Sequence, residues 1–271
     1  MQPQHITFLQ ELLSDTKNAT LTLKEMKSKL LDIYPELQNL TLQTLSNELS
    51  KNQFSFKNLA MCPERQNSEI VKNERKRLVQ KLVYSLYKEY DVIFVDETSL
   101  HFGEKRRYGW GKKGAKISII KQPKSKNYSL LTAISDREIL GCQFIRGGVK
   151  KEDFVGFICS LFKQKNLGIN NSHLIIFLDN ASCHKAKHVK KYLGSKIKFL
   201  FNAGYSPMLN PIEEFFSKLK MMIRKLPTSN ETELVCSTQL ALTKFRTKDF
   251  QGYIRHTLSF VEDCMLKLDL D

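Results

Sequence analysis

The chain has 271 residues, of which 41% are hydrophobic, and it carries a formal net charge of +15 at pH 7. This length and apolar content fit one large or two ordinary globular domains. The excess of positive charge predicts a polyanionic partner, and nucleic acid is favoured over a membrane because no apolar run is long enough to span a bilayer.

Two further features concern the cellular compartment. The N-terminal residues lack the pattern of a secretory signal peptide. The six cysteines include no CxxC pair, which favours reduced thiols over structural zinc. We therefore expect a protein that is not secreted, located in the nucleus of a eukaryotic host or in the cytoplasm and nucleoid of a bacterial one.

Residues 1–60 predict a small all-helical domain of the helix-turn-helix type. The pattern Thr22-x-x-Glu25 is a capping box that opens a helix, and Pro35 ends that helix. A second helix is expected over residues 41–52, and its outward-facing polar side chains can hydrogen-bond base edges and phosphates in a major groove. These side chains are Gln43, Thr44, Asn47, Ser50 and Lys51. A helical cap with a solvated polar face is the alternative interpretation.

Residues 61–88 form a predicted basic linker that continues into a helix. Their position between a DNA-binding domain and a group of carboxylates favours contacts with the DNA backbone. The residues concerned are Arg75, Lys76 and Arg77. The alternative is an ordinary solvated surface.

From residue 89 to residue 271 the pattern changes to alternating strands and helices, which predicts an α/β domain. Its first strand begins at Asp91 and ends in Asp96-Glu97-Thr98. The next stretch, residues 105–126, contains nine Lys or Arg residues and no acid, and its glycines predict a hairpin whose charged tip would follow phosphates. The predicted contacts are Arg106, Arg107, Trp110, Lys112 and Lys113. Core packing is the alternative for the tryptophan.

Further strands are expected over residues 128–135 and 139–145, followed by a helix over residues 153–164. The apolar run Leu174–Leu178 then predicts a buried central strand that delivers Asp179 at its carboxyl end. One basic helix and one more strand follow it.

The segment SPMLNPIEEFF predicts the start of another helix. Asn210 can cap this helix, Pro211 fits its first position and Glu213 falls in its first turn. A carboxylate that ends a buried strand and another that opens a helix are suited to holding metal ions.

Four segments carry a family pattern. They are VDET at 95–98, YGWGKKG at 108–114, FLDNASCHK at 177–185 and SPMLNPIEEFF at 206–216. In this order, with 82 residues between Asp96 and Asp179 and 33 between Asp179 and Glu213, they resemble the mariner-type DDE/D transposase superfamily over roughly residues 60–255. The resemblance implies a ribonuclease H-like mixed sheet flanked by helices, in an enzyme that cleaves DNA phosphodiester bonds and joins strands.

The resemblance also implies roles for individual residues. Asp96, Asp179 and Glu213 would be the catalytic carboxylates that hold two Mg²⁺ or Mn²⁺ ions, with Asn180 and His184 in supporting positions. Such ions activate the attacking hydroxyl and neutralise developing charge, and they prefer carboxylate oxygen as a ligand. The implied partner is double-stranded DNA, on which the chain is expected to form a homodimer.

Helical phase distinguishes Glu213 from its neighbour Glu214. The apolar side chains of the helix form one stripe, with Glu213 at its edge and Glu214 nearly opposite, where Lys218 offers an ion pair. Strand alternation similarly turns Glu97 away from the face of Asp96. We therefore expect Glu213 to be the third ligand.

Relatives in this superfamily usually carry two helix-turn-helix units before the catalytic domain, and this chain has room for one. Two alternative functions remain. One is a host-retained, catalytically retired DNA-binding protein derived from a transposase, which the complete set of three carboxylates disfavours. The other is a ribonuclease H-like nuclease or resolvase, which the helix-turn-helix region disfavours.

Overall fold

The computed structural model describes residues 1–57, 63–103, 128–164, 173–180, 191 and 198–270. The chain divides into two compact units, Met1–Met61 and Cys62–Asp271. Within the described ranges, no helix has the length and apolar character needed to cross a membrane.

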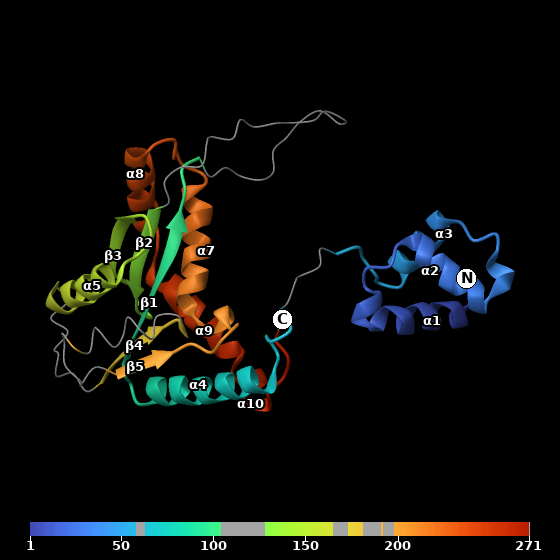
Figure 1. Ribbon diagram of the computed structural model, residues 1–271, viewed down its shortest axis with the longest axis horizontal. Coiled ribbons are helices and arrows are strands. Elements are labelled where there is room, and N and C mark those ends of the chain that lie inside the picture. Colours follow the sequence, from blue (N-terminus) through green and yellow to red (C-terminus); the bar gives the residue numbers. More distant parts are fainter. Residues whose placement is uncertain (58–62, 104–127, 165–172, 181–190, 192–197, 271) are drawn as a thin grey trace. The chain divides into compact units, whose positions relative to one another are not determined.

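The first unit consists of three helices around a small apolar core (Figure 1). They are α1 (Pro3–Ser14), α2 (Leu23–Ile33) and α3 (Leu42–Lys51), with short 3₁₀ turns at Thr16–Asn18 and Pro35–Leu37. The core side chains are Leu9, Met26, Leu30, Leu40 and Leu45. The 3₁₀ turn between α2 and α3 begins at Pro35, where the sequence predicts the end of the first helix.

Local capping explains where α2 and α3 begin. Thr22 Oγ1 accepts the backbone N–H of Glu25 at 3.3 Å, and Glu25 Oε2 accepts the N–H of Thr22 at 2.7 Å. This is the capping box that the sequence predicts, and it satisfies two backbone donors that a helix start leaves unpaired. α3 begins after Thr41, whose Oγ1 accepts the N–H of Thr44 at 3.0 Å.

The second unit contains a five-stranded mixed sheet with the strand order β3-β2-β1-β4-β5. Its strands are β1 (Asp91–Leu100), β2 (Tyr128–Ile134), β3 (Ile139–Arg146), β4 (Leu174–Leu178) and β5 (Lys198–Phe201). β1, β2 and β3 form an antiparallel meander, whereas β4 and β5 run parallel to β1. β1 extends beyond its predicted end to Leu100 because Asp96–Leu100 pair with β2.

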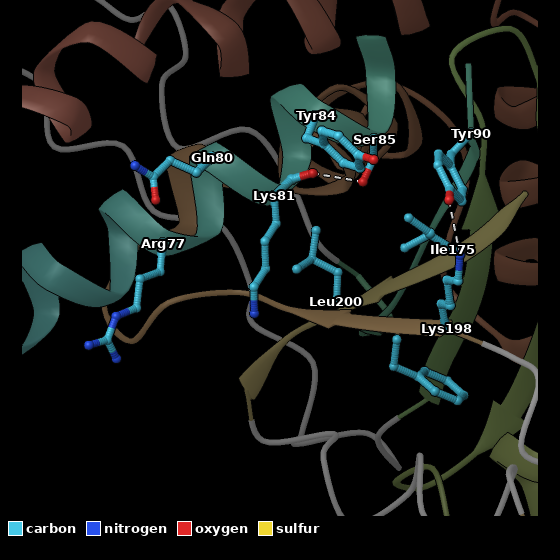
Figure 2. A pocket seen from close by; sticks show the side chains of 10 residues that line it. Arg77, Gln80, Lys81, Tyr84, Ser85, Tyr90, Ile175, Lys198 and Leu200 are labelled. Atoms are coloured by element: carbon cyan, nitrogen blue, oxygen red, sulfur yellow. Dashed lines mark hydrogen bonds between the residues drawn. The ribbon is translucent and has the colours of Figure 1, made fainter. Parts of the chain in front are cut away.

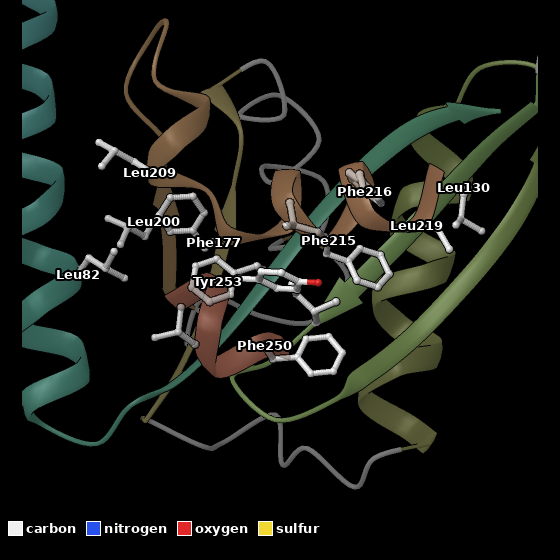
Figure 3. Close-up of a cluster of buried hydrophobic side chains, with 14 of the residues drawn as sticks. Leu82, Leu130, Phe177, Leu200, Leu209, Phe215, Phe216, Leu219, Phe250 and Tyr253 are labelled. Atoms are coloured by element: carbon white, nitrogen blue, oxygen red, sulfur yellow. The ribbon is translucent and has the colours of Figure 1, made fainter. Parts of the chain in front are cut away.

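Helices cover both faces of this sheet, as the predicted fold class requires (Figure 1). They are α4 (Glu69–Tyr87), α5 (Lys151–Gln164), α7 (Pro211–Ile223), α8 (Glu231–Leu242), α9 (Thr247–Ser259) and α10 (Val261–Leu266). α5 packs on one face, over Ile93 and Val95 of β1. α4, α7 and α9 pack on the other face, over Phe94 of β1 and Phe177 of β4 (Figure 3). The alternation along β1 therefore assigns each of its side chains to the α5 face or the α7 face.

α4 contributes to the core of the second unit, and this corrects one prediction about its basic residues. Arg75 is only 1% exposed. Its guanidinium donates four hydrogen bonds of 2.7–3.0 Å, to Ser206 Oγ, to Asn67 Oδ1 and to the carbonyl oxygens of Gln66 and Tyr205. The prediction that Arg75 contacts DNA is wrong, because burial and these bonds leave the guanidinium unavailable to a phosphate.

Candidate metal centre between β1, β4 and α7

Two aspartates reach the same end and the same face of the sheet. Phe94 of β1 lies opposite Phe177 of β4 in the parallel register, and their rings pack 5.2 Å apart in the core on the α7 face. Asp96 and Asp179 each follow two residues later in the same direction. Since side chains alternate with a period of two, both aspartates are directed toward the face that α7 covers.

The third carboxylate, Glu213, comes from the first turn of α7, and the three influence one another's ionisation. The pKa of Asp96 is raised from 3.8 to about 7, chiefly by burial, with the charges of Asp179, Glu213 and Glu97 adding to the rise and a hydrogen bond from the Glu97 backbone opposing it. Glu213 is exposed, but desolvation by the surrounding chain still raises its pKa; Lys220 opposes this rise and the charge of Asp179 adds to it. A bound cation would relieve this repulsion.

Asn210 also belongs to this site, and the sequence reasoning missed its role. It stands at the N-cap position of α7, as predicted, but its side chain makes no capping hydrogen bond. Instead, Asn210 Nδ2 donates to Asp96 Oδ2 at 3.3 Å, while Asp96 Oδ1 accepts the N–H of Glu97 at 2.8 Å. Asn210 and Asp96 are 114 positions apart, so no local pattern could have revealed this bond.

Glu214 turns away from the aspartates and contacts α9. Its Oε1 lies 2.5 Å from Nδ1 of His256. The predicted ion pair between Glu214 and Lys218 is wrong, because Lys218 Nζ lies 2.8 Å from Oδ1 of Asp249 on the same helix α9. The packing of α9 beside α7 supplies both partners, and a helical pattern in α7 alone contains no information about it.

The donor set fits a hard divalent cation in its chemistry. Asp96, Asp179 and Glu213 offer carboxylate oxygens, which Mg²⁺ and Mn²⁺ prefer. Asn210 adds a buried amide oxygen, Oδ1, that has no hydrogen-bond partner within the described part of the chain. No group of three acidic, His or Cys side chains within the described ranges is already close enough to hold an ion. The carboxylates would therefore have to draw closer together around a cation.

The other predicted site residues of the second unit fall into three groups. Asn180 directly follows Asp179 and is exposed, and Glu97 is exposed on a strand position that alternation assigns to the α5 face. On α4, Arg77 is exposed and Lys76 is half-buried. The remaining predicted residues of the second unit lie outside the described residues; they are His184, Arg106, Arg107, Trp110, Lys112 and Lys113.

The predicted DNA-facing side chains of α3 are all exposed. They are Gln43, Thr44, Asn47, Ser50 and Lys51. Gln43 Nε2 donates to Asn47 Oδ1 at 2.9 Å, and Lys51 Nζ lies 2.9 Å from Glu48 Oε1. The Gln43–Asn47 bond holds two amide groups together on the outer face of the helix, with hydrogen-bonding capacity to spare.

A groove of about 450 Å³ lies away from the carboxylates, between α4 and the edge strand β5 (Figure 2). Arg77, Lys81 and Lys198 bring positive charge to it, and Tyr84 and Tyr90 are among its aromatic lining. Its β4 lining residue, Ile175, precedes Asp179 by four residues, so the groove lies nearer the start of β4 than the carboxylates do.

Known proteins resemble the chain in both sequence family and fold. The family model described as the DDE superfamily endonuclease matches residues 91–235. A pre-cleavage Mos1 transpososome shares 15% identity and a TM-score of 0.77, with 100% of this chain and 81% of that chain covered. A mariner Mos1 paired-end complex with Mg is 17% identical to this chain and superimposes with a TM-score of 0.74. The match covers 97% of this chain and 80% of that chain.

The catalytic domain of Mos1 mariner transposase gives 13% identity and a TM-score of 0.58, with 79% of this chain and 100% of that chain covered. No curated protein matches the chain in sequence. These structural likenesses, together with the mixed five-stranded sheet flanked by helices in the described part of this chain, confirm the predicted ribonuclease H-like fold. Because the family model spans more than half of the sequence, the chain belongs to the DDE superfamily of endonucleases.

Proposed function

We propose that the chain is a DNA transposase that cleaves phosphodiester bonds and joins DNA strands with two Mg²⁺ or Mn²⁺ ions. One observation carries the proposal. Asp96, Asp179 and Glu213 come from β1, the end of β4 and the start of α7, and the pKa values of the first and last are raised by desolvation and, to a smaller extent, by the neighbouring carboxylates. Perturbed carboxylates gathered at one end of a sheet are typical of a catalytic site.

In this proposal Asp96, Asp179 and Glu213 would hold the metal ions. When bound there, such ions would supply activation of the attacking hydroxyl and stabilisation of charge on the leaving oxygen. The chain itself would supply the oxygen ligands, and the hydrogen bonds from Glu97 and Asn210 hold the Asp96 carboxylate in one rotation. Because the pKa of Asp96 is raised to about 7, cation binding should release a proton from this site near neutral pH.

The proposed partner is double-stranded DNA. Its phosphates would neutralise part of the net charge of +15, and the exposed polar side chains of α3 would contact the bases. Solved Mos1 structures of similar fold include a paired-end complex with the left transposon end and a strand transfer complex. Their fold supports the proposal that two copies of this chain assemble on DNA.

A direct test combines the purified full chain, MnCl₂ and labelled duplex DNA that carries candidate inverted repeats. The proposal predicts defined nicks and joined products that disappear when EDTA removes the metal. DNA binding without any metal-dependent cutting would favour the retired DNA-binding protein instead. Metal-dependent cutting of RNA but not of DNA would favour the nuclease alternative.

A further inference from the structure

Two asparagines occupy the same helix position in the second unit and use their side chains differently. Asn230 precedes α8, and its Oδ1 accepts the backbone N–H of Glu233 at 2.9 Å, which is the usual capping bond. Asn210 precedes α7 and makes no such bond. Its side chain is therefore available for another task, and its contacts indicate which one.

The donor side of the Asn210 amide acts on Asp96. Nδ2 donates to Asp96 Oδ2, and the backbone N–H of Glu97 occupies Oδ1 of the same carboxylate. Two donors on two oxygens fix the rotation of the carboxylate, and each oxygen retains capacity for a further contact. The backbone carbonyl of Asn210 also accepts the N–H of Glu213 at 3.1 Å, so one residue bonds to the carboxylate of Asp96 and to the backbone of Glu213.

The acceptor side of the same amide is buried and unpaired. Asn210 is only 3% exposed, and its Oδ1 has no hydrogen-bond partner within the described ranges. Burying an amide oxygen in this way costs free energy that an apolar side chain of similar shape would avoid. Unpaired buried groups of this kind are rare, and functional sites are one place where they are retained.

We propose that Asn210 is a positioning residue of the metal centre, in which Nδ2 orients Asp96 and Oδ1 accepts a hydrogen bond from a water molecule bound to the cation. The inference rests on the proposed metal-dependent function. Mg²⁺ usually keeps several of its waters when it binds to protein carboxylates, and such waters need acceptors. The unpaired Oδ1 belongs to the same carboxamide as the nitrogen that contacts Asp96, so it lies beside the ligands.

The test compares Asn210→Ala with Asn230→Ala in the full chain and measures the melting temperature as MnCl₂ is titrated. The wild type should melt at higher temperature as Mn²⁺ binds to the folded state. Asn230→Ala should melt at a lower temperature than the wild type at every Mn²⁺ concentration. It should need the same Mn²⁺ concentration as the wild type for the same rise in melting temperature. Asn210→Ala should require about 10- to 100-fold more Mn²⁺ for the same rise, the usual effect of removing a residue that supports a metal ligand.

A second variant, Asn210→Leu, keeps the branched shape without polar atoms. It should be at least as stable as the wild type without metal, because the buried unpaired oxygen is gone, and should show the same weakened Mn²⁺ response. An unchanged Mn²⁺ response in either Asn210 variant would overturn the assignment while leaving the proposed function intact. A wild type that neither responds to Mn²⁺ nor cuts DNA would overturn both.

Discussion

Glu214 and His256 are in direct contact, with Oε1 of the glutamate 2.5 Å from Nδ1 of the histidine. The contact joins the first turn of α7 to α9 and directs Glu214 away from β1 and β4. It leaves Glu213 as the glutamate of this turn that interacts electrostatically with Asp96 and Asp179.

Replacing each glutamate with glutamine should separate a ligand from a packing residue. Glu213→Gln should lower the rate of metal-dependent cutting by roughly 100-fold or more, since losing a metal ligand removes several kcal/mol of transition-state stabilisation. Glu214→Gln should retain most of the activity, because it alters only the contact with His256. A side-by-side nicking assay measures both rates, and the reverse order of effects would show that Glu214 is the third ligand.

The raised pKa of Asp96 predicts how stability depends on pH without metal. Between pH 4 and pH 7 the folded protein keeps a proton on Asp96 that the unfolded chain has already lost, because the pKa rises from 3.8 to about 7 on folding. The stabilisation is therefore complete below about pH 4 and is lost as the pH rises through about 7. At about 1.4 kcal/mol per pKa unit, the loss amounts to a few kcal/mol.

Asp96→Asn provides the matching measurement. The neutral amide cannot ionise, so this variant should show a flatter dependence of unfolding free energy on pH and should be more stable than the wild type at pH 8 in EDTA. Urea unfolding at several pH values gives both quantities. Identical pH profiles for the two proteins would mean that folding does not raise the pKa of Asp96.

Arg75 and Arg77 lie two residues apart on α4 and should differ in their effect on stability. Arg75→Ala leaves four hydrogen-bond acceptors without their donor and should lower the unfolding free energy by about 3 kcal/mol. Arg77→Ala should change it by less than about 0.5 kcal/mol, because its side chain is exposed. Urea titrations that gave equal effects would contradict the structural role of Arg75.

DNA affinity should respond to the exposed cations. Binding should weaken steeply as salt rises, since each neutralised phosphate releases a counterion. Arg77→Ala should reduce the slope of log affinity against log salt by about 1. Alanine at all four of Arg106, Arg107, Lys112 and Lys113 should reduce it by about 4. Fluorescence anisotropy with a labelled duplex measures the slope. An unchanged slope in the fourfold variant would show that these four residues do not contact DNA.

The sequence predicts most of the fold because strong local patterns specify it. The capping box at Thr22 and Glu25, the apolar run before Asp179 and Pro211 at the first position of α7 each contain the physical cause of the element they begin.

Strand alternation also assigns Asp96 and Glu97 to opposite faces of β1, in agreement with the structure, where Asp96 is half-buried and Glu97 is exposed. The helical phase predicted for the two glutamates of α7 is wrong, because Glu213 is exposed and Glu214 is half-buried beside His256 of α9.

Residues that depend on distant partners could not be predicted in this way. Arg75 lies in a basic run that predicts an exposed segment. Its burial depends on Tyr205 and Ser206, about 130 positions away. Asn210 reads equally well as a helix cap, and only the approach of α7 to β1 reveals its bond to Asp96. A local pattern predicts the orientation of a side chain on its own helix or strand, but tertiary packing determines which residues that side chain contacts.

The most direct test of the central claim measures Mn²⁺-dependent cutting and DNA affinity together for Asp96→Asn, Asp179→Asn and the control Asp91→Asn. Asp91 is an exposed acid at the other end of β1, so its variant should cut DNA at the wild-type rate. The Asp96 and Asp179 variants should bind DNA as tightly as the wild type or slightly more tightly, because they lose a negative charge, and should not cut it. Metal-dependent cutting by either of these two purified variants would contradict the assignment of the carboxylates.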